Sequence, residues 1–280
     1  MTPRPDDAPS DVPARLDTEL VRRGLARSRG DARDLVADGC VLVGGRPATK
    51  PAQPVERTTA LEVARRGPAR VSRAADKLEA ALDRWAPAGL SVAGRRCLDV
   101  GASTGGFTQV LLDRGAAHVV ALDVGHGQLS AAVAEDPRVE DRSGTTVRGL
   151  APQDIGGAAD VLVVDLSFIS LTLVAAELAV LVAPVGDVIT LVKPQFEVGR
   201  GRLTKHGVVA KATDRLRALE AVIEAMAAAG LSTHGLAASP VRGGEGNTEY
   251  LLWLRRDPSG KMDPDAVAAA ARTLVTEGPA

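Results

Sequence analysis

One segment constrains the fold of this 280-residue chain more than any other: Cys97-Leu98-Asp99-Val100-Gly101-Ala102-Ser103-Thr104-Gly105-Gly106-Phe107. The apolar stretch Arg95–Val100 predicts a strand, a glycine-rich turn follows it, and a helix is predicted near Phe107–Arg114. Glycines give the backbone positive φ angles and let it approach a ligand closely. A strand, glycine loop and helix in this order predict a ligand site at the carboxyl edge of an open α/β sheet.

The remainder of the larger part of the chain alternates between strand and helix patterns. Further strands are predicted at His118–Val124, Val161–Leu166, Val188–Val192 and Glu249–Arg255. Helices are predicted at Arg73–Trp85, Ile169–Val182, Lys211–Ala229 and Pro264–Val275. Repeated strand–helix units with apolar strands predict an α/β fold, a mostly parallel sheet with helices on both faces.

The loop and the next strand together indicate what this edge binds. Asp123 ends the second strand, 22 residues after Gly101, where a carboxylate can accept hydrogen bonds from both hydroxyls of a ribose. Dinucleotide sites usually have the pattern G-x-G-x-x-G, whereas this loop has G-x-x-x-G-G. The pattern favours S-adenosylmethionine, which has no phosphate, over a dinucleotide or a tight turn with purely structural glycines. The candidate cofactor-binding residues are Asp99, Gly101, Ala102, Ser103, Gly105, Gly106, Phe107 and Asp123.

The N-terminal part has a different pattern. We predict a disordered tail over residues 1–11, a small domain over 12–63, a linker over 64–72 and the α/β domain over 73–280. Within the small domain, helices are predicted at Arg15–Gly24 and Arg29–Asp38, and strands at Cys40–Val43 and Ala60–Val63, with a turn at Gly44-Gly45. This is a compact α+β module.

Charge is distributed unevenly along the chain. Residues 12–77 contain 14 Lys/Arg and 8 Asp/Glu, a net charge of +6, so the other residues carry −7 of the total of −1. Segregated basic charge is typical of a nucleic-acid surface, although a solvated arginine-rich surface would have the same composition. Aromatic residues make up only 2% of the chain, which favours recognition of folded RNA through its backbone and shape over base stacking. The candidate RNA-binding residues are Arg15, Arg22, Arg23, Arg27, Arg29, Arg33, Arg46 and Lys50.

Several other classes of protein are not favoured. Cys40 and Cys97 provide neither a disulfide framework nor metal-ligand spacing, and the four histidines show no ligand spacing, so we predict no metal. The sequence contains no apolar run of the roughly 20 residues that span a bilayer, and its first residues do not form a signal peptide. A cytoplasmic protein without membrane contact is expected.

Two groups of motifs resemble a known family. They are Asp99–Phe107 with Asp123-Val124-Gly125-His126-Gly127-Gln128-Leu129, and Arg15-Leu16-Asp17, Gly24-Leu25-Ala26, Ser28-Arg29 and Lys50-Pro51. Over roughly residues 12–256 the chain resembles the TlyA-type ribosomal RNA 2′-O-methyltransferases, also called hemolysin A-like proteins. The resemblance implies an S4-type RNA-binding domain followed by an FtsJ/RrmJ-like domain with the Rossmann-like class I methyltransferase fold.

The resemblance also implies a catalytic tetrad of Lys77, Asp165, Lys193 and Glu249. The strand pattern independently places Asp165 and Lys193 at the carboxyl edge of the sheet, because each directly follows an apolar strand. Lys193 is the first candidate to take or steer the hydroxyl proton. Lys77 could hold a phosphate or act on Lys193, and Asp165 and Glu249 could orient the lysines, so the base stays unassigned.

The expected function is S-adenosylmethionine-dependent 2′-O-methylation of ribosomal RNA, at cytidine, by a monomer whose partners are ribosomal RNA or ribosomal subunits. A non-catalytic RNA-binding or ribosome-assembly factor with a retained methyltransferase fold is the alternative. The glycine loop and the four charged positions weigh against it. A hemolysin is the least favoured, because no membrane-active segment is evident.

Overall fold

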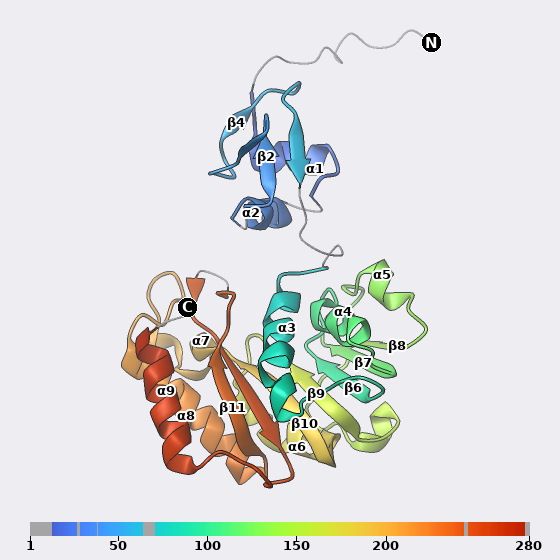
Figure 1. The fold of residues 1–280 in the computed structure, drawn as a ribbon, viewed down its shortest axis with the longest axis vertical. Coiled ribbons are helices and arrows are strands. Elements are labelled where there is room, and N and C mark those ends of the chain that lie inside the picture. Colours follow the sequence, from blue (N-terminus) through green and yellow to red (C-terminus); the bar gives the residue numbers. More distant parts are fainter. Residues whose placement is uncertain (1–12, 27–28, 38, 64–70, 244–245, 278–280) are drawn as a thin grey trace. The chain divides into compact units, whose positions relative to one another are not determined.

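The computed structural model describes residues 13–26, 29–37, 39–63, 71–243 and 246–277. The chain divides into two compact units, residues 1–69 and 70–280, each with its own hydrophobic core (Figure 1). The predicted tail and most of the predicted linker lie outside the described residues.

The first unit is a small α+β module. Its described elements are β1 (Ala14–Arg15), α1 (Leu16–Arg22), α2 (Arg29–Ala37), β2 (Val41–Val43), β3 (Arg46–Pro47), β4 (Pro54–Val55) and β5 (Leu61–Val63). Leu16 and Leu20 on one face of α1 and Val36 on α2 are buried together with Val41 and Val55 of the strands. The two predicted helices are confirmed, each within two residues of its expected ends.

Its strands form two antiparallel sheets, one with the order β3-β2-β5 and one that pairs β1 with β4. The predicted turn at Gly44-Gly45 connects β2 to β3, and the predicted strand near Ala60–Val63 is β5. The pattern did not predict β1, β3 or β4. Each has two residues, which is too short for an alternation of apolar and polar side chains to appear.

The second unit is built on a seven-stranded sheet. Its strands are β6 (Arg96–Val100), β7 (His118–Asp123), β8 (Val139–Ser143), β9 (Ala159–Val164), β10 (Val182–Val192), β11 (Ser232–Ala238) and β12 (Tyr250–Arg255). Their order is β11-β12-β10-β9-β6-β7-β8, with β6 to β10 parallel and β12 antiparallel to both of its neighbours. The predicted mostly parallel sheet is confirmed.

Helices cover both faces of this sheet (Figure 1). They are α3 (Ala74–Trp85), α4 (Gly106–Asp113), α5 (Ala131–Ala134), α6 (Ala175–Leu181), α7 (Pro194–Glu197), α8 (Ala212–Ala228) and α9 (Pro264–Glu277), with short 3-10 turns η1 (Ala86–Ala88), η2 (Pro152–Ile155), η3 (Leu171–Leu173) and η4 (Arg200–Arg202). No helix in the described part of the chain is long and apolar enough to cross a membrane.

Alternation along the strands decides which face each helix covers. Cys97 of β6 points into a core shared with Leu78 of α3 and Leu111 of α4. Its neighbour Leu98 points to the opposite face and into the core with Leu219 of α8. Because successive strand side chains alternate between faces, near-continuous apolar strands supply both cores.

The structure differs from the predicted elements chiefly at β8, at β11 and over residues 169–182, besides the short helices α5 and α7, which were not predicted. β8 has the sequence VEDRS and lies at an edge of the sheet, half exposed, so it has no apolar run. β11 was missed because Gly235 and His234 interrupt it; a Cβ atom at Gly235 would overlap the ring of Trp85. The helix predicted over Ile169–Val182 is instead a loop, η3 and the short α6, since the Ser170 hydroxyl accepts a hydrogen bond from the Thr172 amide and begins η3.

Candidate active site

The parallel strands β6, β7, β9 and β10 end along one edge of the sheet. The residues at these ends are Gly101 after β6, Asp123 at the end of β7, Asp165 after β9 and Lys193 after β10. The carboxyl edge of a parallel sheet is the usual ligand site of open α/β folds. The strand pattern therefore brings together a glycine loop and three charged side chains.

Gly101 lets the loop after β6 lie directly against the end of β9. Its amide donates to the carbonyl of Leu122 at 2.8 Å, and its φ of +89° is unfavourable for other residues. A Cβ atom there would lie 2.7 Å from the backbone oxygen of Asp165. The adjacent Asp165 amide donates to the carbonyl of Val100 at 3.0 Å. Any side chain at Gly101 would therefore separate the loop from Asp165.

The rest of the glycine segment packs inward. A Cβ atom at Gly106 would overlap the hydroxyl of Ser72, so this glycine allows α4 to begin against the residues that precede α3. Phe107 is 2% exposed and lies in the core with Leu78 and Leu111. The Phe107 side chain thus packs beneath the loop as part of the core.

A cavity of about 520 Å³ opens at this edge. It is lined by Gly101, Ser103, Leu122, Asp123, Val124, Gly125, Gln128, Thr146, Val147, Asp165, Leu166, Ser167, Phe168 and Ile169. Its volume is within the usual range for small-molecule sites, and its mixture of aliphatic and polar groups is typical of them. Of the predicted cofactor residues, Gly101, Ser103 and Asp123 line it, whereas Asp99, Ala102, Gly105, Gly106 and Phe107 do not.

Asp123 is fixed by the two loops on either side of it. One carboxylate oxygen accepts from the Ser103 amide at 2.9 Å, and the other accepts from the Gly125 amide at 2.7 Å. Each oxygen can still accept a second hydrogen bond. The carboxylate is therefore held in one orientation while it remains able to bind a pair of neighbouring hydroxyls.

Asp99 lies completely buried beneath the loop. Its Oδ2 accepts from the Thr108 hydroxyl at 2.7 Å, and its Oδ1 has no hydrogen-bond partner among the described residues. Burial raises the pKa of Asp99 to about 7; the Thr108 hydrogen bond opposes the rise, and the nearby charges of Asp165 and Asp123 add to it. A buried carboxylate with a free oxygen and acidic neighbours favours a positively charged ligand.

Lys193 forms the first of two ion pairs at this edge. Its Nζ lies 2.7 Å from Asp165 Oδ1 and donates to the Ser167 hydroxyl at 2.8 Å. The side chains of Lys193 and Asp165 are 9% and 13% exposed. The ammonium group is thus oriented by two neighbours and is nearly shielded from water.

Lys77 and Glu249 form the second ion pair. The distance from Lys77 Nζ to Glu249 Oε2 is 2.6 Å, and the two side chains are 9% and 2% exposed. The Gln195 side chain lies near the other carboxylate oxygen of Glu249 at 3.5 Å. Such a buried pair is strongly destabilised when one partner is removed, so each charge depends on the other.

The sheet register brings the two pairs to the same edge. Val192 of β10 pairs with Tyr250 of the antiparallel strand β12. Lys193, which follows Val192, and Glu249, which precedes Tyr250, therefore lie at the same edge of the sheet. Val164 pairs with Thr190, which places Asp165 beside the end of β10. The structure thus assembles all four residues of the predicted tetrad at one edge, including Lys77 from α3, 172 residues away from Glu249 along the chain.

The loop from Asp165 to Leu171 forms one wall of the cavity and is itself held in place. The Glu197 carboxylate accepts from the Ser170 hydroxyl and from the Leu171 amide. Phe168 adopts a positive φ of 67° and is 90% exposed, with its ring 5.2 Å from that of Phe196. A strained, exposed aromatic residue at a cavity indicates a functional surface.

Sequence reasoning missed part of this site. It overlooked Ser167 and Phe168, although both directly follow a predicted strand and therefore had to lie at the functional edge. It overlooked Val147 as a wall residue because the preceding strand, β8, was not recognised. Thr108, one helical turn into α4, gave no signal by itself.

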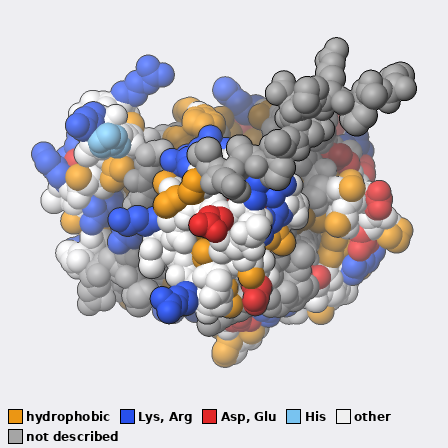
Figure 2. Space-filling view, turned by 90° about the horizontal axis from the view of Figure 1, so that it is seen from above, with side chains coloured by type: hydrophobic (Ala, Val, Ile, Leu, Met, Phe, Trp, Pro, Cys, Tyr) orange, Lys and Arg blue, Asp and Glu red, His pale blue; other side chains and the backbone are white. Residues whose placement is uncertain are grey.

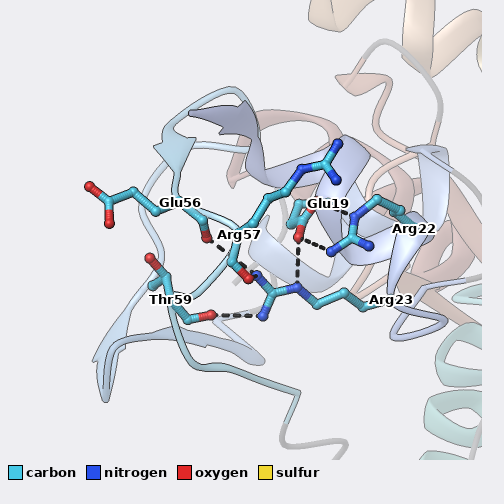
Figure 3. A network of polar contacts seen from close by, with 6 residues as sticks. All are labelled: Glu19, Arg22, Arg23, Glu56, Arg57 and Thr59. Atoms are coloured by element: carbon cyan, nitrogen blue, oxygen red, sulfur yellow. Dashed lines mark hydrogen bonds and ion pairs between the residues drawn. The ribbon is translucent and has the colours of Figure 1, made fainter. Parts of the chain in front are cut away.

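Five of the candidate RNA-binding arginines of the first unit form two groups around buried carboxylates. Arg15, Arg29 and Arg33 surround Asp17. Arg22 and Arg23 both contact Glu19, and burial opposes but does not overcome the effect of Arg22, which lowers the pKa of Glu19 to about 2 (Figure 3). The arginines therefore have defined positions.

Arg23 differs from the others because its donors are used within the unit. It donates to Glu19 and to the backbone carbonyls of Glu56, Arg57 and Thr59, and its side chain is only 20% exposed (Figure 3). This arrangement clamps α1 to the loop over residues 56–59 and leaves little of Arg23 for RNA.

The remaining candidates are less constrained. Arg46 and Lys50 are exposed near the β2–β3 hairpin. Arg27 lies outside the described residues. The space-filling view shows Lys and Arg side chains at several places on the face of the molecule seen from above (Figure 2).

Family models match both parts of the chain. The model for FtsJ-like methyltransferases matches residues 70–256, and the model for the S4 domain matches residues 14–60. The two matches follow the order of the two units.

Similar proteins cover nearly the whole chain. The 16S/23S rRNA (cytidine-2′-O)-methyltransferase TlyA of Mycobacterium tuberculosis is 50% identical over 267 residues, which are 95% of this chain and 98% of that protein. Hemolysin A of Brachyspira hyodysenteriae is 37% identical over 238 residues, 85% of this chain and 98% of that protein. A solved structure of a protein described as a candidate hemolysin, from Streptococcus thermophilus, is 34% identical and covers 96% of this chain and 97% of its own, with a TM-score of 0.73.

Proposed function

Because the chain belongs to the FtsJ-like methyltransferases and carries an S4 domain ahead of its methyltransferase domain, we propose that it methylates the ribose 2′-hydroxyl of cytidines in ribosomal RNA. One observation carries the proposal: two buried lysine–carboxylate pairs lie at the sheet edge that also holds the cavity. The name of the relative from M. tuberculosis, identical at half of the aligned positions, supplies the substrate class.

S-adenosylmethionine fits the cavity. When bound, it supplies an electrophilic methyl group on a positively charged sulfur. Asp123 offers acceptors for its two ribose hydroxyls, Val124 and Val147 offer apolar contacts for a purine, and Asp99 supplies a negative charge below the glycine loop. The absence of a phosphate from this cofactor agrees with the acidic character of the site, which would repel a pyrophosphate.

Lys193 is the group that acts on the hydroxyl. As the new bond to carbon forms, the 2′-hydroxyl releases its proton to solvent water, and partial negative charge develops on the oxygen. An ammonium held by Asp165 and Ser167 can orient this oxygen and stabilise that charge without having to reorganise. Lys77, paired with Glu249, provides a second fixed positive charge for the neighbouring phosphate or the same oxygen.

Two surfaces provide RNA contacts under this proposal. On the first unit, the half-exposed guanidinium groups of Arg15, Arg29 and Arg33 contact backbone phosphates. On the second unit, the exposed ring of Phe168 beside the cavity offers a stacking surface to the target nucleotide. We further propose that the protein acts as a cytoplasmic monomer on ribosomal subunits.

The proposal is tested by incubating the full-length protein with S-adenosylmethionine labelled in its methyl group and with ribosomal subunits that lack this modification. We expect label to enter ribosomal RNA, and none to enter ribosomal protein. An unrelated folded RNA of similar length serves as the control for specificity. Absence of label from ribosomal RNA at saturating cofactor, with cofactor binding demonstrated, would contradict the proposal.

A further inference from the structure

Three arginines converge on one buried carboxylate in the first unit. Arg15 donates to both oxygens of Asp17, at 3.0 and 2.8 Å, while Arg29 lies at 3.4 Å and Arg33 at 3.7 Å. The side chain of Asp17 is 0% exposed, whereas those of the three arginines are 48%, 54% and 58% exposed. The carboxylate therefore lies beneath a surface layer of guanidinium groups.

The local sequence explains the convergence. Arg15 precedes α1 and Asp17 lies in its first turn, while Arg29 and Arg33 are four residues apart on one face of α2. Asp17 thus contacts cations from the β1–α1 junction and from two successive turns of the other helix. The hydrogen bond from Arg15 is the largest cause that holds the pKa of Asp17 well below its usual range, so Asp17 is charged at every physiological pH.

The cluster has the right charge and exposure to bind an anion. Three guanidinium groups and one carboxylate carry a net charge of +2, and solvent reaches the positive groups but not the negative one. A phosphate that approaches from solvent therefore meets donors that are already oriented. Arginine binds phosphate oxygens through paired donors, and such contacts depend on orientation as well as on charge.

The second buried carboxylate of the unit provides a contrast. Glu19 is also shielded from solvent, and of its two arginines Arg22 is 48% exposed, whereas Arg23 is 20% exposed and donates to backbone carbonyls of the loop over residues 56–59 (Figure 3). Through Arg23, Glu19 therefore stabilises the fold of the unit. All three arginines around Asp17 are about half exposed to solvent.

We propose that Asp17 is a positioning residue for RNA binding, which holds Arg15, Arg29 and Arg33 as a preformed cluster for phosphodiester groups of the RNA backbone. Without Asp17, each long side chain would have to be ordered when RNA binds, and ordering lowers affinity. The inference rests on the proposed function, because it takes ribosomal RNA as the ligand.

The test compares two substitutions that each remove one negative charge from the same unit. Asp17→Asn removes the group beneath the arginines, while Glu56→Gln removes an exposed carboxylate that points away from the arginine network (Figure 3). Charge alone predicts slightly tighter RNA binding for both variants. The positioning role predicts binding about tenfold weaker for Asp17→Asn, and unchanged or slightly tighter binding for Glu56→Gln.

The measurement is the dissociation constant of the full-length protein for a ribosomal RNA fragment at several salt concentrations. If Asp17→Asn binds fewer phosphates, the slope of log K against log salt also becomes shallower, by about one for each phosphate that is no longer bound. Equal affinities of the two variants would overturn the positioning role. Failure of the wild-type protein to bind or methylate ribosomal RNA would instead overturn the proposed function.

A double-mutant cycle separates positioning from folding. In a chain that already carries Arg15→Gln, Arg29→Gln and Arg33→Gln, we expect Asp17→Asn to cause no further loss of RNA affinity. A further loss as large as in the wild-type background would show that Asp17 acts through the fold of the unit. Loss of hydrogen-exchange protection over residues 14–63 in Asp17→Asn would overturn the inference in the same way.

Discussion

The buried carboxylates of the first unit and Asp99 of the second unit have opposite neighbours. In the first unit, Asp17 and Glu19 contact arginines, which lower the pKa of both groups. In the second unit, burial raises the pKa of Asp99 to about 7, and the nearest charges that affect it are those of Asp165 and Asp123. Arginines around an acid present a positive surface to a polyanion, whereas acids that lack such partners attract a cation.

The distribution of charge along the chain agrees with this difference. Residues 12–77 carry a net charge of +6 and the other residues −7, so an overall charge of −1 conceals two regions with different electrostatic tasks. At the carboxyl edge of the sheet in the second unit, Lys77 and Lys193 each lie against one carboxylate. Substitutions at these groups test whether the two units differ in this way.

The largest effect is expected from Lys193→Ala. Loss of the charge that faces the developing oxyanion should lower the rate of methyl transfer by about 10³-fold or more, because one preorganised donor alone contributes roughly 10²–10³. Cofactor affinity should change little, since Lys193 does not line the cavity. Single-turnover kinetics and equilibrium cofactor binding measure the two quantities, and full activity in this variant would exclude Lys193 from the chemistry.

Glu249→Gln should have the next largest effect, because it leaves the Lys77 ammonium buried without its partner. We expect unfolding of the second unit to require about 3 kcal/mol less free energy, measured by chemical denaturation. The double variant Lys77→Met with Glu249→Leu should recover most of this stability but none of the activity. Recovered activity would mean that the pair serves only the fold.

A smaller effect is expected from pH acting on Asp99. In the cofactor-free protein this group holds a proton below its pKa of about 7 and ionises above it. A positively charged cofactor favours the ionised form, so affinity for S-adenosylmethionine should rise about tenfold as pH increases through about 7 and then level off. Isothermal titration between about pH 6 and 8 tests this rise.

Two variants sharpen that measurement. Asp99→Asn should abolish the pH dependence, and Thr108→Val should move the midpoint to higher pH because it removes the hydrogen bond that opposes the raised pKa. An unchanged profile in Asp99→Asn would assign the titration to another group.

The smallest effect is expected from Arg23→Gln in the first unit. Loss of its hydrogen bonds to the carbonyls over residues 56–59 should destabilise the unit by about 1 kcal/mol. Its RNA affinity should fall less than that of Arg15→Gln, since Arg23 is mostly buried. Hydrogen exchange and RNA binding provide the two readouts, and a larger loss of affinity in Arg23→Gln would contradict its structural role.

The sequence was most informative where an apolar run alone determines a buried strand. The apolar runs Val161-Leu162-Val163-Val164 and Val188–Val192 predicted buried parallel strands, and the charged residues after them had to lie at the carboxyl edge, as Asp165 and Lys193 do. The half-exposed edge strand β8 has no such run, and Val147, which follows it, was missed as a wall residue in consequence.

The local sequence patterns did not predict interactions between residues that are far apart along the chain. Nothing in the local pattern around Arg23 indicates that its donors are used by carbonyls 33 to 36 residues away, so it appeared equivalent to Arg22. Likewise, Phe107 follows the glycine loop but packs into the core. The identity of a residue predicts its chemistry, whereas its partners decide whether that chemistry is available.

Methylation of the ribose oxygen of cytidine in ribosomal RNA is tested by identifying the modified nucleoside. RNA labelled by the full-length protein is hydrolysed with alkali, which cannot cleave the bond next to a blocked 2′-hydroxyl, and is then analysed by mass spectrometry. We predict that the label is found in alkali-resistant dinucleotides that contain 2′-O-methylcytidine. Label in alkali-released mononucleotides, with the methyl group on the base, would contradict the claim.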